Sequence, residues 1–248
     1  AVTVADGMYV SDCGSASSGR WLLAMGSVTF GSYGEGMFGG RRALVITPVP
    51  THPTTHGNRA RVLHLTQFLA ELGFEVHVAM WLSGVAQDNA IMQQEFGPRF
   101  HGLPYEKPLR RRESLIGKWV RRARQLVDED ARYTEGVDDW YDDRADPILR
   151  RLDAEIGFDI AIAEYVFMSR ALLALQSPRL KLIDAHDLFA NRHRLFLAAG
   201  ATPQFFSTSP AEERRGLLRA DVVLGIQPAE TAVLNAYPEW QIPAHVIT

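Results

Sequence analysis

The sequence contains a single cysteine, no long apolar run and little net charge. Only Cys13 among the 248 residues is a cysteine, so no disulfide can form within the chain, and a reducing cytoplasm is the expected compartment. The longest uncharged stretches, residues 21–34 and 195–211, are interrupted by glycine or proline, which excludes a transmembrane helix. The net charge of −3 excludes a general nucleic-acid binder, whose footprint is strongly basic.

The sequence also lacks a G-x-S-x-G motif, so nucleophilic hydrolysis has no obvious nucleophile. The composition, with 46% hydrophobic and 22% charged residues, is typical of a globular protein. The length is large for one ordinary domain and small for two nucleotide-binding domains of roughly 150 residues each.

Residues 1–40 differ in composition from the rest of the chain. They hold nine of the 20 glycines and no proline, which is typical of short strands and turns. We interpret this segment as a Gly-rich, β-type appendage or as the end of a preceding module. The motif G-x-G-x-x-G at residues 34–39 is not expected to bind a cofactor, because a strand and not a helix is predicted to follow it.

Residues 41–248 alternate short apolar runs with helical periodicity, which predicts an α/β fold with a Rossmann-like parallel sheet and helices on both faces. The expected strands are residues 43–47, 75–81, 159–165, 180–184 and 221–226. A helix is predicted over residues 61–72, with Gly73 ending it. Ligands bind at the carboxyl ends of the strands in such sheets.

A charge-segregated insert is predicted at about residues 105–147. Residues 107–124 hold eight basic side chains and one acidic one, whereas residues 128–146 hold nine acidic and two basic ones. An apolar stripe within residues 115–126 could lie on an anionic membrane surface. The alternative is a solvated helix that packs this stripe on the domain while neighbouring charges pair; the stripe consists of Leu115, Trp119, Ala123 and Leu126.

The loop after the first predicted strand is a candidate anion site. Gly57 would let the backbone approach a ligand closely, Asn58 is predicted to cap the following helix, and Arg59 and Arg61 add positive charge. The alternative is an ordinary connecting loop. A metal pair of His52 and His56 is not expected, since no third ligand lies nearby.

His186 follows another predicted strand and stands between two carboxylates, Asp184 and Asp187. Such a histidine can be held in one tautomer, bind a polar ligand or accept a proton. A buried structural histidine is the competing interpretation.

Taken together, these segments resemble the N-terminal domain of a retaining glycosyltransferase of the GT-B fold, close to glycosyltransferase family 4 (group 1). The resemblance covers residues 41–248. It depends on the runs ALVITPVP, LHLTQFLAELGFEVHVAMW and DIAIAEY, on a D-x-H-D-x-F-x-x-R pattern at residues 184–192, and on an E-x-x-x-L-x-x-A-D pattern at residues 213–221.

The resemblance implies a hexosyltransferase-type enzyme of polysaccharide biosynthesis. It would move a sugar from a nucleotide-diphosphate donor to a glycan or lipid-linked acceptor, without an essential metal or other cofactor. The site residues that it implies are His186 as the catalytic group, Gly57, Asn58 and Arg59 at the donor diphosphate, and His56, Asp187 and Arg192 at the acceptor.

The family's donor half carries two glutamates separated by seven residues, and no pair in this sequence has that spacing. The chain is therefore expected to be the acceptor-side half, catalytically incomplete without a C-terminal donor-binding domain. Peripheral attachment at the inner membrane face through residues 115–126 is a further expectation. Two alternatives stay open: a non-catalytic GT-B-like module that binds a glycan or a protein, and a nucleotide-sugar epimerase of GT-B fold.

Overall fold

The computed structural model describes residues 2–4, 8–10, 40–82, 85–106, 119, 129–236 and 244–246. Val2–Val4 (β1) and Met8–Val10 (β2) form a separate two-stranded antiparallel sheet. The G-x-G-x-x-G motif and Cys13 lie outside the described residues. The predicted division of the chain at residue 40 stays a prediction.

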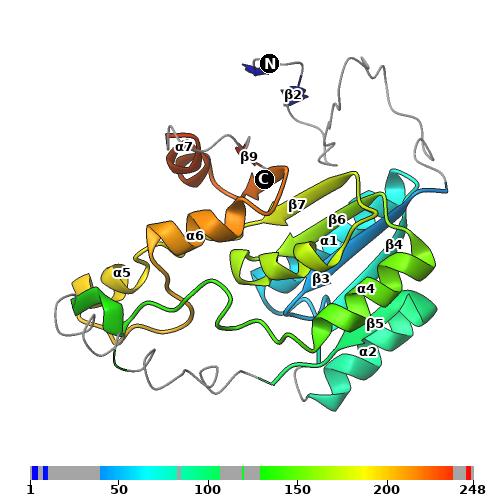
Figure 1. Cartoon of the computed structure of the whole chain (residues 1–248), viewed down its shortest axis with the longest axis horizontal. Coiled ribbons are helices and arrows are strands. Elements are labelled where there is room, and N and C mark those ends of the chain that lie inside the picture. Colours follow the sequence, from blue (N-terminus) through cyan, green and yellow to red (C-terminus); the bar gives the residue numbers. More distant parts are fainter. Residues whose placement is uncertain are drawn as a thin grey trace.

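Seven parallel strands form the main sheet, in the order β5-β4-β3-β6-β7-β8-β9 (Figure 1). The direction of strand addition reverses between β3 and β6, which places the topological switch point of the sheet there. The α/β Rossmann-like sheet predicted from the sequence is therefore confirmed. The strands are β3 Arg42–Thr47, β4 Glu75–Trp81, β5 Phe100–Leu103, β6 Ile160–Glu164, β7 Leu180–Asp184, β8 Val222–Gly225 and β9 Ala244–Val246.

Helices cover both faces of the sheet because alternate strand residues are buried on opposite sides. Ala43 and Val45 of β3 share a core with Val62 and Leu69 of α1 (Gly57–Glu71), and α2 (Ala86–Phe96) packs through Met92 on β4. Leu44 and Ile46 face the opposite core, which is covered by α4 (Ala145–Ile156), the 3₁₀ segment η3 (Val166–Ala174) and α6 (Pro210–Leu217).

The shorter elements complete the described chain. They are the 3₁₀ turns η1 (Gly97–Arg99) and η2 (Glu129–Arg132) and the helices α5 (His193–Ala198) and α7 (Pro228–Ala236). None of the described helices combines the length and the apolar character needed to traverse a bilayer.

The predicted strands agree with the structure to within a residue or two, and β9 lies where the sequence of residues 245–248 also predicts a strand, but β5 was not predicted. Its four residues include His101 and Gly102 and have little apolar periodicity, so pairing with β4 decides its conformation. The first helix also begins earlier than predicted. His56 and not Asn58 is its N-cap, which corrects the predicted cap, whereas Gly73 has φ 95° and ends the helix as expected.

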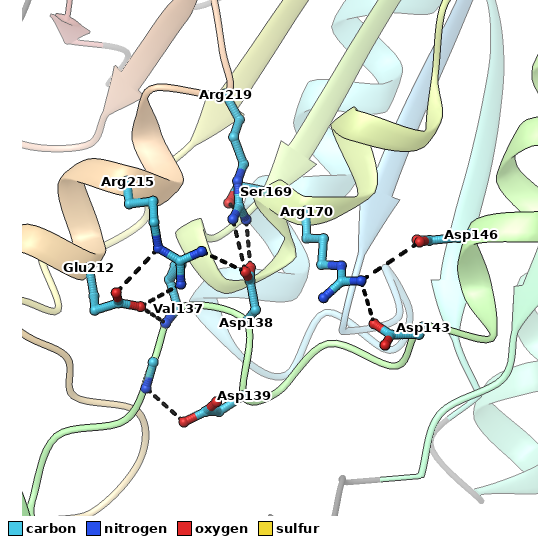
Figure 2. Close-up of polar contacts among 11 residues, drawn as sticks. Val137, Asp138, Asp139, Asp143, Asp146, Ser169, Arg170, Glu212, Arg215 and Arg219 are labelled. Carbon is cyan, nitrogen blue, oxygen red and sulfur yellow. Dashed lines mark hydrogen bonds and ion pairs between the residues drawn. The ribbon is translucent and has the colours of Figure 1, made fainter. Parts of the chain in front are cut away.

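The insert is described only in part. The basic stripe predicted to meet a membrane lies outside the described residues apart from Trp119, which is helical and 71% exposed. The acidic half pairs with arginines that come from other elements (Figure 2). Asp138 binds Arg215 and Arg219, and Arg170 of η3 lies 2.9 Å from Asp143. These ion pairs fasten the returning chain to α6 and η3.

Gly216 of α6 permits this attachment. A Cβ atom at Gly216 would lie 2.6 Å from Val166 Cγ2 and 2.7 Å from Val137 Cγ2, closer than van der Waals contact allows. Only glycine therefore lets α6 pack so closely on η3 and on the insert.

Candidate functional site

Four ionisable side chains meet at the carboxyl ends of the strands beside the topological switch point. Glu164 ends β6, Asp184 ends β7, His186 follows two residues later, and Arg61 reaches them from α1. The Arg61 guanidinium donates to both Asp184 carboxylate oxygens, at 2.6 and 2.8 Å. The Glu164 Oε2 atom lies 2.5 Å from His186 Nε2. We call these four residues the switch-point cluster.

The backbone holds the histidine in this position. His186 has φ 58° and Tyr165 has φ 69°, and both values lie in the left-handed region that non-glycine residues seldom adopt. The Tyr165 ring stacks on the imidazole at 4.0 Å between ring centroids. Two residues in unfavourable conformations beside one another indicate that the surrounding structure constrains the orientation of His186.

Burial determines the electrostatics of the cluster. Glu164 is fully buried, and His186 is 5% exposed. Burial raises the pKa of Glu164 to about 6, and the neighbouring Asp184 carboxylate acts in the same direction. Burial opposes the charging of His186, but the hydrogen bond to Glu164 and the carboxylates of Glu164 and Asp184 outweigh it, so the imidazole pKa is raised. The Glu164–His186 pair therefore holds a proton more tightly than either group would in water.

Glu164, Asp184 and His186 also have the chemical types of a metal site, with ligand atoms within 4.8 Å of one another. However, the Arg61 guanidinium already neutralises Asp184, and the Glu164 oxygen nearest the histidine is hydrogen-bonded to it. A cation could coordinate all three side chains only if Arg61 withdrew, so the arrangement fits a proton better than a metal ion.

The start of α1 adjoins the cluster and carries the predicted diphosphate residues. His56 makes no side-chain cap, and the first turn of the helix contains no acidic residue. A Cβ atom on Gly57 would have no neighbour within 4 Å. Burial raises the pKa of Tyr165 to about 12, and the neighbouring Asn58 side chain acts in the opposite direction. Asn58 of the helix start therefore lies beside the aromatic ring that covers His186.

The other predicted site residues have different surroundings. Arg59 donates to the His52 carbonyl oxygen at 3.2 Å and pairs with Asp88 of α2 at 3.3 Å. His56 is exposed, and its Nδ1 lies 2.9 Å from the Thr55 hydroxyl. Arg61, by contrast, points into the cluster. The predicted role of Arg59 at a diphosphate stays a prediction.

Asp187 and Arg192, predicted at the acceptor, form an ion pair at 2.7 Å. The Arg192 guanidinium also lies over the Phe189 ring. His186 was expected to be held by its flanking carboxylates, but its hydrogen-bond partner is Glu164, from the neighbouring strand. This correction has a topological cause: β6 and β7 are adjacent and parallel, so Glu164 stands directly beside Asp184.

Two glutamates of the site region were not singled out from the sequence as site residues. Glu164 is the last residue of an otherwise apolar strand, and that position was the available signal. Glu213 of α6 is 4% exposed, and its carboxylate accepts hydrogen bonds from two backbone N–H groups. The N···O distances are 2.5 Å for Phe189 and 3.1 Å for Ala190. Burial raises the pKa of Glu213 to about 7. Glu213 thereby holds the loop that follows His186.

No family model and no curated protein matches the chain. Among solved structures, the chain is similar to UGT2 of Phytolacca americana complexed with UDP-2fluoro-glucose and pterostilbene, with 9% identity, a TM-score of 0.40, and coverage of 83% of this chain and 53% of that one. It is also similar to the spinosyn forosaminyltransferase SpnP, with 13% identity, a TM-score of 0.38, and coverage of 84% and 50%. The chain thus spans about half the length of each.

Proposed function

We propose that the chain is the acceptor-side half of a GT-B glycosyltransferase that takes a sugar from a nucleotide-diphosphate donor. One observation carries the proposal. The start of α1 at Gly57, which has open space around it, and the buried Glu164–His186 pair both lie at the switch point of the sheet. Sheets of this type bind ligands at this position.

Gly57 supports the proposal because the fold itself does not require glycine there. Its φ is not among the positive values, and a side chain would meet nothing within 4 Å. A bound group that approaches the backbone N–H groups of the first helical turn supplies a reason for glycine. A diphosphate is such a group, since a helix N-terminus favours an anion.

The chemistry of glycosyl transfer is compatible with these side chains. The diphosphate gains negative charge as it leaves, so the N–H groups of the helix start and the Arg59 guanidinium would lower the barrier without a protein nucleophile. His186 would contact the donor sugar, with Asp187 and Arg192 on the acceptor side. We further propose net retention at the anomeric carbon, a glycan or lipid-linked acceptor, and attachment to an anionic membrane through residues 115–126.

The first experiment is an activity assay of the 248 residues and of a longer protein that also contains a donor-binding domain. Each is incubated with UDP- and GDP-sugars, with and without a glycan acceptor. Glycoside formation that needs both the longer protein and the acceptor supports the proposal, and the anomeric coupling constant of the product tests retention. Robust transfer by the 248 residues alone would show that the half-enzyme assignment is wrong, and conversion of the donor without an acceptor would indicate an epimerase.

Substitution of Gly57 gives a matched test of the diphosphate site. Gly57→Val and Gly57→Trp should leave the melting temperature nearly unchanged, because the added atoms point into open space. In the longer protein that contains the donor-binding domain, donor KM should rise about tenfold or more with valine and further with tryptophan. Gln67→Val, on the exposed face of the same helix, is the control and should alter neither KM nor kcat.

A further inference from the structure

The switch-point cluster has more negative than positive charge unless it binds a proton. Glu164, Asp184 and His186 are 0%, 1% and 5% exposed, so water screens them poorly. Arg61 compensates Asp184 through two hydrogen bonds and leaves Glu164 without a cation of its own. A buried, uncompensated carboxylate is costly, so the imidazole is the group that must balance Glu164.

In the Glu164–His186 pair, each side chain forms a hydrogen bond through only one of its two polar atoms, as far as the described residues show. Glu164 Oε1 is buried and has no hydrogen-bond partner among the described residues, so the bond from Oε2 to His186 Nε2 is the side chain's polar contact. Nε2 of His186 must carry the hydrogen of this bond, because an ionised carboxylate only accepts. No described residue hydrogen-bonds Nδ1 on the other side of the ring.

We propose that Glu164 is the positioning residue of His186, holding the imidazole by Nε2 so that Nδ1 is the ring atom offered to a ligand at the switch point. The backbone of Glu164 is fixed by its register with Asp184 in the sheet, so the carboxylate cannot follow the ring if it turns. Tyr165 stacks on the ring and restrains the remaining rotation. That a ligand meets Nδ1 depends on the proposed function, whereas the orientation of the ring does not.

The proton affinity of the histidine follows from this arrangement. The groups that face it are Arg61 from α1, Glu164 from β6 and Asp184 from β7. The two carboxylates raise the imidazole pKa and Arg61 lowers it, with the direct bond to Glu164 the strongest of the favourable contributions. Removing the Glu164 charge should therefore release the proton at a lower pH.

The test is a pH titration of the ring nitrogens of His186 by ¹⁵N NMR, with the resonances assigned from the spectrum of a His186→Gln variant. The native protein should show a doubly protonated ring below the imidazole pKa and, above it, a neutral ring protonated at Nε2. In Glu164→Gln the amide oxygen can still accept from Nε2, so the tautomer should persist while the imidazole pKa falls by at least one unit, a tenfold loss of proton affinity. In Glu164→Ala both tautomers should appear.

Asp187→Asn is the matched control. It removes a carboxylate next to His186 in sequence, but that side chain is 42% exposed and paired with Arg192. The imidazole pKa should change by less than about 0.3 unit. A neutral native ring protonated at Nδ1 and not at Nε2, or an equal pKa change in Asp187→Asn and Glu164→Gln, would overturn the proposal. If neither Glu164 variant folds, the native tautomer alone decides.

UDP-glucose and a GDP-sugar, each with a sugar that would reach His186 under the proposed function, are then titrated into the native protein. A shift of the His186 Nδ1 resonance, absent from Nε2, supports both the positioning role and a ligand at this edge. If the tautomer and the pKa behave as proposed but neither compound shifts Nδ1, the ligand-facing part of the inference is wrong. The positioning of the ring by Glu164 then stands, and the result counts against the proposed function.

Discussion

Two clusters of arginines and carboxylates in this protein use the same side-chain types but differ in charge balance. In the switch-point cluster one arginine serves two buried carboxylates, and a histidine must compensate the second. In the cluster of Figure 2, which we call the insert cluster, Asp138 and Glu212 are matched by Arg215 and Arg219. Burial opposes ionisation of Asp138, but the two arginines outweigh it and lower the carboxyl pKa. Balanced pairs fasten elements together, whereas an unbalanced buried group keeps a proton available for chemistry.

The largest effect is expected from removing the single arginine of the switch-point cluster. Arg61→Met leaves Asp184 buried without its cation and should lower the free energy of unfolding by about 3–5 kcal/mol. Urea denaturation measures this loss. Adding Asp184→Asn to Arg61→Met should recover part of it, because the uncompensated charge is then gone. A loss below about 1 kcal/mol in the single variant would show that the cluster does not depend on Arg61.

The second expectation concerns the packing that brings the insert cluster together. Gly216→Val places methyl groups where Val166 and Val137 already stand, and should cost about 1–3 kcal/mol of stability by overpacking. Thermal denaturation measures the effect. Val233→Ala, a change on the exposed surface of α7, is the control and should have little effect. Unchanged stability in Gly216→Val would mean that α6 can separate from η3 without cost.

The third expectation separates the two arginines of the insert cluster. The Arg219 side chain is 9% exposed and contacts both Asp138 and Ser169, whereas the Arg215 side chain is 49% exposed. Arg219→Met should destabilise the fold by about 2 kcal/mol, since Asp138 Oδ1 and the buried Ser169 hydroxyl lose their guanidinium partner. Arg215→Met should cost no more than about 1 kcal/mol, as exposed ion pairs do. Equal losses in urea denaturation would contradict the distinction.

The smallest expected effect is a pH dependence at Glu213. Its folded pKa is about 7, above that of an unfolded glutamate, so the folded state keeps a proton that the unfolded state has released. Stability from this group is therefore present at low pH and is lost as the pH rises toward 7. Relative to native protein, Glu213→Gln should gain about 1 kcal/mol between pH 6 and pH 7, measured as the change in their stability difference. A constant difference would show that Glu213 is already ionised at pH 6.

The strands could be predicted from the sequence because each is an apolar run bounded by turn residues, as in 75–81 and 180–184, which match β4 and β7. The short strand β5 could not, since its residues have no strong strand preference and acquire one by pairing with β4. His186 was predicted as a site residue because it follows a strand. Asp184 and Asp187, its neighbours in sequence, were expected to hold it, but its hydrogen-bond partner is Glu164. Glu164 lies on the adjacent strand, and strand adjacency cannot be read from a single sequence.

The sequence by itself determined the α/β class, most strands of the sheet and the edge at which polar residues gather. Apolar periodicity and glycine placement act locally, so they can be read along the chain. Only the tertiary structure decided that Glu164 holds His186, that Arg61 and not Arg59 enters the cluster, and that the acidic insert pairs with α6 and η3. These contacts join residues 22 to 123 positions apart, where the order of strands and the burial of charge select the partner.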